Sequence, residues 1–294
     1  MLLCEKFGSE SEFISAGEHE IERICAAARD GKPKQRSNNG EARRWNMKDI
    51  AARAEKDAAF MKSRGIRWTS IIESDYPPLL REIYDPPVVL FYRGALPVPE
   101  KPAAALVGSR RPSPAAARWA YTAARELSLA GVVVVSGMAL GIDSMAHRGC
   151  VDAAYADGFG ENASFGGAVP TAAVFGSSVD EVYPASNRLL ARRIVESGGV
   201  LLSEYPPGTI PAKWHFPARN RIISGLCRCV VIVEAGEKSG ALITAEFALE
   251  QGRDLYVAGG ADTFGMGTRK LADEGAKIVR NSREIIAELT AGIE

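Results

Sequence analysis

The sequence predicts an α/β fold in which helices cover both faces of a parallel β-sheet. From residue 103 onward, short apolar runs rich in β-branched residues alternate with longer segments of helical character. Continuous apolar runs indicate strands that are buried on both sides, and their alternation with helices indicates parallel pairing. The predicted strands cover residues 104–107, 132–135, 172–175, 200–202, 230–233, 255–258 and 277–279. The predicted helices between them cover residues 115–130, 143–155, 187–197, 241–251 and 269–275.

Residues 1–73 are more charged and predict a small helical region in front of the sheet domain, which we place at residues 74–294. Helices are expected at 16–29 and at 46–64, and the second has apolar residues close to helical spacing. The segment 31–40 between them is polar and basic and contains turn residues, so we expect a loop there.

The composition is typical of a soluble globular protein, with 46% hydrophobic and 24% charged residues. Because 36 basic side chains balance 36 acidic ones, the chain is not coated in positive charge as histones are. A local basic groove is still compatible with this balance, since charges act over about 10 Å at ordinary salt. No apolar run reaches the roughly 20 residues of a membrane helix. The five cysteines lack the spacing of a zinc site or a redox pair. We therefore expect reduced thiols, no bound metal and a cytoplasmic protein.

Glycine and polar residues follow the predicted strands, at the sheet edge where ligands of such folds collect. Gly108, Ser109 and Arg110 come directly after the first strand of this domain. Gly108 permits a sharp turn, and the Ser109 hydroxyl can donate to a phosphate oxygen. Taken alone, this loop also fits an ordinary βα turn with surface arginines.

The second strand is followed by Gly137 and then by Asp143 and His147, which can share one helix face. An Asp–His pair suggests acid–base chemistry. However, the sequence has no nucleophile in a strained elbow motif to complete such a site. We favour a structural hydrogen bond for this pair.

Further polar positions follow the later strands. Gly176 comes after the third strand, and Asn187 and Arg188 stand at the start of the next helix. Trp214 and Phe216 lie beside the cluster of Arg219, Asn220 and Arg221. Aromatic rings next to arginines suit base stacking combined with phosphate contact, as in single-strand binders. Packing of the two aromatic residues in the core is the alternative.

The stretch from Phe216 to Thr244 passes from a short helix through a strand into a turn of small residues. Ser239 and Gly240 in this turn open a second helix at Ala241, and a helix N-terminus attracts anions. A lone nucleotide needs only one such loop. Several polar loops along one sheet edge therefore favour an extended ligand with many phosphates.

At these residues the sequence resembles the DNA-processing protein A family (DprA, also called Smf). The resemblance covers residues 74–290 and rests on segments such as LVGSRRPS, VVSGMALGIDSMAHRG, KWHFPARNRIISGL and VVIVEAGEKSGALITAEFAL. It implies an extended Rossmann fold that binds single-stranded DNA, protects it and hands it to the RecA recombinase during natural transformation of competent cells and recombination. It also implies a homodimer without a cofactor, a membrane association or an established catalytic activity. The DNA-binding residues implied are Gly108, Ser109, Arg110, Gly137, Gly176, Asn187, Arg188, Phe216, Arg219, Asn220, Arg221, Ser239, Gly240 and Thr244.

The chain also departs from this family's usual pattern. We expect no C-terminal winged-helix domain, because the sequence ends at Glu294, shortly after the sheet domain. The proline-glycine pair that usually follows the sixth main strand is replaced by residues 258–260, Ala-Gly-Gly. A glycine-rich surface loop is expected at 157–167 and is longer than usual.

Two alternatives to DNA binding stay open at this point. The wider superfamily resembles nucleoside-monophosphate phosphoribohydrolases, and Thr244 and Glu246 stand where those enzymes carry a Thr and a catalytic Glu. The double-glycine loop of those enzymes is missing here. The second alternative is a sensor that binds a free nucleotide rather than DNA.

Overall fold

The computed structural model describes residues 47–97, 101–156, 171–259 and 265–291. The helix and the two loops predicted at 16–29, 31–40 and 157–167 lie outside these residues. Contacts divide the chain into two compact units, one of residues 1–65 with 72–74 and the other of residues 66–71 with 75–294. In the first unit, helix α4 covers Met47–Arg64 and confirms the helix predicted at 46–64.

In the part of the second unit that the structure describes, one sheet has nine strands in the order β1-β2-β6-β5-β4-β3-β7-β8-β9. All seven predicted strands are present, and their pairings with one another are parallel. They are β3 (Ala103–Val107), β4 (Val133–Ser136), β5 (Thr171–Val174), β6 (Val200–Ser203), β7 (Cys229–Ile232), β8 (Asp254–Ala258) and β9 (Lys277–Val279). The predicted fold class is therefore confirmed.

Two strands that the sequence pattern did not predict extend one edge of the sheet. These are β1 (Arg67–Ser70) and β2 (Val89–Gly94), which pair antiparallel with each other. Strand β2 also pairs antiparallel with β6, so the parallel sheet gains a two-strand antiparallel margin. Strand β1 precedes residue 74, where we placed the start of the sheet domain, and yet belongs to the sheet unit.

The chain order of the strands reverses next to β3. From β3 the chain runs outward through β4, β5 and β6, and it later returns to place β7 on the other side of β3. The register sets Ala104 of β3 opposite Cys229 of β7. In doubly wound sheets the ligand crevice opens at such a reversal, outside the carboxyl ends of the two strands.

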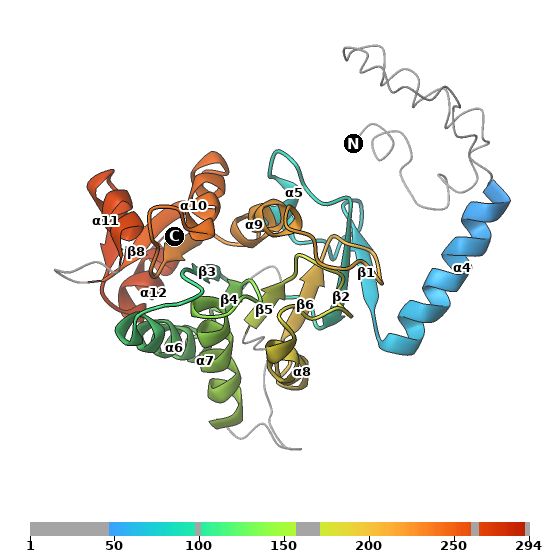
Figure 1. Ribbon diagram of the computed structural model, residues 1–294, viewed down its shortest axis with the longest axis horizontal. Helices are drawn as coiled ribbons and strands as arrows, with labels where there is room; N and C mark the ends of the chain where they lie inside the picture. The colour runs from blue at the N-terminus through green and yellow to red at the C-terminus, as the bar shows by residue number, and fades with distance from the viewer. Residues whose placement is uncertain (1–46, 98–100, 157–170, 260–264, 292–294) are drawn as a thin grey trace, which may run out of the picture. The chain divides into compact units, whose positions relative to one another are not determined.

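Helices cover both faces of the sheet (Figure 1). Ala103, Ala105 and Val107 of β3 face one core cluster, and Ala104 and Leu106 face the other, because side chains alternate along a strand. The first cluster includes residues of α5 (Pro78–Arg81), α9 (His215–Gly225) and α10 (Gly240–Glu250). The second includes residues of α6 (Pro114–Leu129), α7 (Ile142–Ala156) and α12 (Ser282–Ala291). The other described helices of this unit are η1 (Ala185–Asn187), α8 (Arg188–Glu196) and α11 (Met266–Asp273).

Helices α6 and α7 pack closely because small residues line their contact. Ala116, Ala120 and Ala124 of α6 are fully buried. A Cβ atom on Gly149 of α7 would lie 2.2 Å from the Tyr121 carbonyl oxygen, so only glycine fits there. Close packing of this pair fixes the positions of the loops that precede both helices. Among the described helices, none is long and apolar enough to cross a membrane.

Candidate nucleic-acid interface

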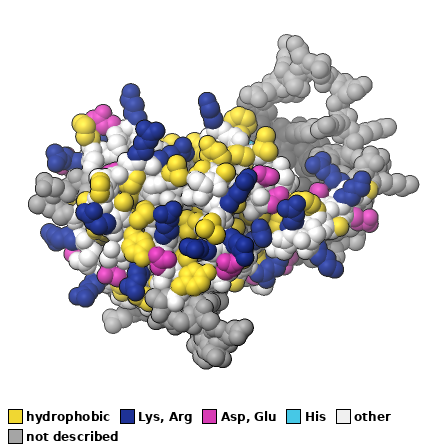
Figure 2. All heavy atoms as spheres, turned by 60° about the horizontal axis from the view of Figure 1, so that its bottom comes forward, with side chains coloured by type: hydrophobic (Ala, Val, Ile, Leu, Met, Phe, Trp, Pro, Cys, Tyr) yellow, Lys and Arg dark blue, Asp and Glu magenta, His cyan; other side chains and the backbone are white. Residues whose placement is uncertain are grey.

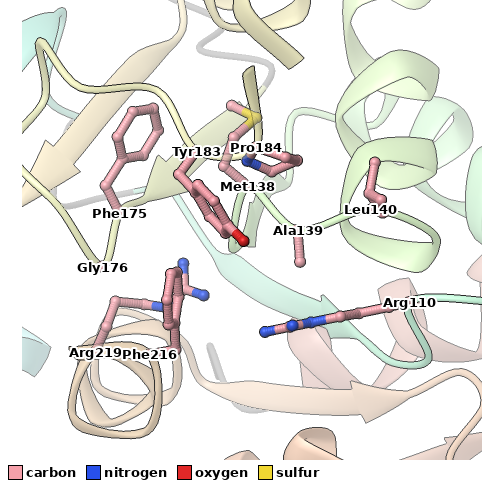
Figure 3. A pocket seen from close by; sticks show the side chains of 10 residues that line it. All are labelled: Arg110, Met138, Ala139, Leu140, Phe175, Gly176, Tyr183, Pro184, Phe216 and Arg219. Carbon is pink, nitrogen blue, oxygen red and sulfur yellow. The ribbon is translucent and has the colours of Figure 1, made fainter. Parts of the chain in front are cut away.

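A groove of about 870 Å³ opens at the carboxyl ends of β3 and β7, where the strand order reverses. The loops after these two strands, the start of α10 and one face of α9 form its walls. A smaller pocket of about 80 Å³ adjoins the groove and reaches toward the end of β5 (Figure 3). The residues that line both spaces are Arg110, Ala139, Tyr183, Phe216 and Arg219.

The structure brings most of the predicted site residues together. The predicted residues that line the groove or the pocket are Gly108, Ser109, Arg110, Gly176, Phe216, Arg219, Asn220, Ser239, Gly240 and Thr244. The predicted residues that do not line either space are Gly137, Asn187, Arg188 and Arg221. Segments more than 100 residues apart in the sequence therefore meet at one sheet edge, as the doubly wound topology requires.

The loop after β3 is held from two sides. A Cβ atom on Gly108 would lie 2.9 Å from the Glu234 carbonyl oxygen and 2.8 Å from Ile142 Cγ1, so this approach needs glycine. The Ser109 N–H donates to the Glu234 carbonyl oxygen at 2.7 Å, and the Ile142 N–H donates to the Ser109 carbonyl oxygen at 3.1 Å. These contacts fix the backbone, while the side chain of Arg110 remains exposed.

Helix α9 supplies the opposite wall. Phe216, Arg219 and Asn220 are three and four residues apart and so share one helix face. The guanidinium carbon of Arg110 lies 5.8 Å from the centre of the Phe216 ring, in a cation–π contact. The rings of Tyr183 and Phe216 are 5.5 Å apart and tilted by 44°. Two aromatic rings and an exposed guanidinium thus lie at the mouth of the pocket (Figure 3).

Arg219 is a buried cation that faces the pocket. Its side chain donates to the Val174 carbonyl oxygen, and the residue is only 5% exposed. Its Nε has no hydrogen-bond partner within the described part of the chain. Burial lowers the pKa of Arg219 to about 10, while Asp143 opposes the shift and Arg110 adds to it. The guanidinium therefore stays positive at neutral pH, and it points into the pocket across from Arg110 (Figure 3).

Asp143 is the carboxylate that accompanies Arg219. Burial raises the pKa of Asp143, and the charge of Arg219 counteracts this rise. A Cβ atom on Gly137 would lie 2.5 Å from Asp143 Oδ2 and 2.6 Å from the terminal nitrogens of Arg219. Gly137 therefore leaves room for these two charged side chains and does not itself line the groove.

His147 is buried and contacts the loop after β4, which carries Gly137. Its Nε2 lies 2.6 Å from the Gly137 carbonyl oxygen, and its Nδ1 lies 2.7 Å from Thr171 Oγ1. Burial lowers the pKa of His147 to about 4, so the ring is neutral and its Nε2–H donates to Gly137. The sequence favoured a structural hydrogen bond between Asp143 and His147, but the hydrogen-bond partners of His147 are Gly137 and Thr171 instead. His147 and Asp143 share no hydrogen bond among the described contacts and form no acid–base pair.

Asn187 and Arg188 lie behind the pocket and outside it. The Asn187 side chain is buried and donates to the Met138 carbonyl oxygen at 2.9 Å. It thereby holds the loop that carries Met138, which lines the pocket. Arg188 is exposed at the start of α8. Its part in DNA binding stays a prediction.

Arg221 makes ion pairs away from the groove lining. Its terminal nitrogens lie 2.9 and 2.7 Å from the two carboxylate oxygens of Glu204. Its Nε lies 3.1 Å from Asp85 Oδ2. Burial lowers the pKa of Arg221, but the hydrogen bonds and charge of Glu204 outweigh it and leave the pKa raised. The geometry assigns Arg221 to holding α9 in place.

The start of α10 contributes backbone groups to the groove. Ser239 is the N-cap of this helix, and its side chain accepts from the Ala241 N–H at 3.3 Å. The lining residues that sequence reasoning missed include Tyr183, Lys213 and Lys238, whose side chains carry a polar group or a charge. Lys238 directly precedes the predicted Ser239 turn and could have been found from that position. The other two lie in loops without periodicity, where the sequence gives no signal.

The sequence model of the DNA recombination-mediator protein A family matches residues 67–290. The chain belongs to this family. DNA processing protein DprA of Streptococcus pneumoniae (strain ATCC BAA-255 / R6) is 42% identical over 221 residues, which is 74% of this chain and 73% of that protein. DNA processing protein DprA of Bacillus subtilis (strain 168) is 38% identical over 234 residues, which is 79% of this chain and 74% of that protein.

Solved structures agree with this membership. The X-ray structure of DNA processing protein A from Streptococcus pneumoniae superposes with a TM-score of 0.67 at 34% identity and covers 94% of each chain. A structure of DNA processing protein A from Helicobacter pylori, which describes its single-stranded DNA binding mode, gives a TM-score of 0.63 at 29% identity. It covers 77% of this chain and 97% of the other. The match to the DNA recombination-mediator protein A family begins where β1 begins, so β1 and β2 are part of the family's domain.

Proposed function

We propose that this protein binds single-stranded DNA in the groove at the ends of β3 and β7. The observation that carries the proposal is the convergence of Arg110 and Arg219 from opposite walls on a pocket flanked by Phe216 and Tyr183. Cations that grip phosphates beside rings that stack on bases are the combination found in single-strand binders. The Helicobacter pylori relative, whose structure describes such binding, supports the same function here.

The charge in the groove suits a polyanion although the whole chain is neutral. The basic residues that line the groove are Arg110, Lys213, Arg219 and Lys238, and the acidic one is Asp143. On the face shown in Figure 2, by contrast, Lys and Arg side chains lie interspersed with Asp, Glu and hydrophobic ones. The excess of positive charge in the groove can hold phosphates there.

A titration that compares single strands with duplex tests the proposal. Fluorescence anisotropy would follow a labelled oligodeoxynucleotide, alone and paired with its complement, at several salt concentrations. We expect the single strand to bind at least tenfold more tightly, because the rings reach only unpaired bases. The logarithm of its affinity should fall with the logarithm of salt by about 0.7 for each phosphate contacted. Equal affinity for both forms would reject single-strand binding.

We further propose that the bound strand is protected from nucleases and passed to the RecA recombinase by a homodimer. The family description as a recombination mediator supports this step. Nuclease digestion of the complex should spare the bound segment. The protein should also shorten the lag of RecA assembly on single strands that carry a single-strand-binding protein. Sedimentation at micromolar concentration should give twice the monomer mass of 31.5 kDa.

The hydrolase alternative has less support from the geometry. Thr244 is buried and lines the groove, but Glu246 is exposed on α10 and does not line it. A catalytic base must come within hydrogen-bond reach of the bond that it attacks. The absence of enzymatic activity stays a prediction. Release of free base from nucleoside monophosphates during incubation with the protein would overturn it.

A further inference from the structure

Two helices begin beside the point where the strand order reverses, and their N-termini are used differently. In doubly wound folds a ligand phosphate commonly sits at the N-terminus of the helix that follows the first strand. That helix is α6 here. The N–H of its N-cap residue, Ser113, donates to both carboxylate oxygens of Glu234, at 3.1 and 3.0 Å. A side chain of the protein thus occupies the place where a phosphate would bind.

Two other positions at the start of α6 offer no free N–H. The Ser113 hydroxyl oxygen accepts from the Ala116 N–H at 3.2 Å. Pro114 is the first residue of the helix and has no N–H to offer. Glu234 follows the end of β7, and its carbonyl oxygen accepts from the Ser109 N–H. The backbone of Glu234 is therefore fixed to the loop after β3, and this holds its carboxylate in place at the start of α6.

In the part of the chain that the structure describes, no carboxylate accepts a hydrogen bond from the start of α10. Gly236, Lys238, Ser239 and Gly240 line the groove there. Among the described contacts, the Gly240 N–H has no hydrogen-bond partner. A phosphate at this end would meet a free N–H and a lysine, whereas one at α6 would meet a carboxylate of like charge.

We propose that Glu234 is a specificity-determining residue that excludes phosphate monoesters, such as free nucleotides, from the first-helix phosphate site. A mononucleotide has one phosphate group and depends on one good site for it. A DNA strand makes many weaker contacts along the groove and does not need that site. The inference rests on the proposed function, because it explains why the groove takes a polymer in preference to the abundant free nucleotides.

The test uses the full chain with the substitutions Glu234→Ala and Glu234→Gln, and with Glu237→Ala as a matched control. Glu237 is an exposed carboxylate in the turn after β7, so its removal changes the net charge equally without vacating the site. Isothermal titration with thymidine monophosphate measures the phosphate site, and anisotropy with a labelled single strand measures the groove.

We expect Glu234→Ala to bind thymidine monophosphate at least tenfold more tightly than the wild type, since it frees the Ser113 N–H and removes a like charge. Glu237→Ala should change that affinity less than threefold. Glu234→Gln should gain much less than Glu234→Ala, because its amide oxygen still accepts from Ser113. A folded Glu234→Ala protein without such a gain overturns the inference, as does an equal gain in the Glu237→Ala control.

A measurement on the wild-type protein gives a second test that needs no variant. In a titration with inorganic phosphate followed by amide NMR, the Gly240 resonance should shift while the Ser113 resonance stays in place. A phosphate-dependent shift at Ser113 overturns the inference. Failure of the inference is distinguishable from failure of the proposed function. If only the inference is wrong, the wild-type protein still binds single strands. If the proposed function is wrong, the wild-type protein does not bind single strands, whatever the affinity of Glu234→Ala for the mononucleotide.

Discussion

Arg219 and Arg221 stand two residues apart on α9 and face different parts of the molecule. Successive helical residues are rotated by about 100°, so this spacing directs the two side chains to nearly opposite sides. Arg219 is 5% exposed and points into the pocket, and its Nε has no hydrogen-bond partner among the described residues. Arg221 makes a two-point ion pair with Glu204 and a third contact with Asp85. On one face of α9 an arginine thus points toward the ligand pocket, and on the other face an arginine holds the helix in place through ion pairs.

The two arginines differ in how many of their N–H groups already have hydrogen-bond partners within the protein, and this number determines whether the side chain can bind a ligand. A guanidinium whose donors are all used by carboxylates has little left for a ligand. Arg219 has one carbonyl partner and a carboxylate neighbour, so it keeps donor capacity toward the pocket. Substitutions on the two faces should therefore separate stability from DNA affinity.

The largest expected effect is on stability and comes from the anchoring face. Replacing Arg221 with alanine leaves the Glu204 carboxylate, only 19% exposed, without its main partner. Breaking such a pair should lower the free energy of unfolding by about 3 kcal/mol, measured by urea denaturation. Affinity of the folded variant for single strands should change less than threefold. The control is Arg192→Ala, whose ion pair with Glu196 is exposed, so its loss should leave the free energy of unfolding nearly unchanged. Equal losses in the two variants would contradict the anchoring role.

Low pH should destabilise the groove face through His147. Its pKa is lowered from 6.5 to about 4, so the folded protein holds the neutral ring. A lowered folded-state pKa contributes stability that is present above pH 6.5 and is lost as the pH falls toward 4. We expect this contribution to reach about 3 kcal/mol, since one pKa unit corresponds to about 1.4 kcal/mol. The free energy of unfolding of His147→Gln should depend less steeply on pH in this range. Parallel pH profiles of the variant and the wild type would refute this assignment.

Loss of the Phe216 ring should weaken DNA binding with a smaller effect. Stacking on one aromatic side chain contributes about 1 to 3 kcal/mol per base, so Phe216→Ala should bind single strands roughly tenfold more weakly. The slope of affinity against salt should stay the same, because the ring contacts no phosphate. Phe216→Leu keeps apolar bulk without the ring and should lose nearly as much, whereas Phe216→Tyr should bind like the wild type. Anisotropy titrations at three salt concentrations separate these outcomes. Full affinity in the leucine variant would show that bulk, and not stacking, matters.

The sequence was sufficient for the parallel strands and for the edge at which the site lies, because both follow from local patterns. Apolar runs mark buried strands, and strand order places the loops after β3 and β7 side by side. The antiparallel strands β1 and β2 were missed, since only one of the four residues of β1 and two of the six residues of β2 are buried. Their pairing depends on β6, which lies more than 100 residues away.

The individual roles in the Arg219–Arg221 cluster could not be predicted from the sequence. Helical geometry predicts that the two side chains point in different directions, but it does not predict which of them faces the sheet edge. Glu204 and Asp85 decide this, and both lie outside α9. Gly137 likewise matched a ligand loop by pattern, whereas its contacts show that it makes room for Asp143 and Arg219.

The smallest expected effect belongs to Lys238, an exposed lysine at the rim of the groove. Its removal should cost DNA affinity about 0.5 kcal/mol, since an exposed ion pair with a phosphate is weak and screened by salt. The more specific readout is the slope of the logarithm of affinity against the logarithm of salt concentration. This slope should fall by about 0.7 if one phosphate contact is lost. Lys270→Ala removes another exposed lysine, one on α11 that pairs with Glu274, and it should leave the slope unchanged. If both variants reduced the slope alike, the attraction would come from the net charge of the protein. A change confined to Lys238 would place a phosphate at the start of α10, on the same side of the groove as Arg219 and away from the anchoring face of α9.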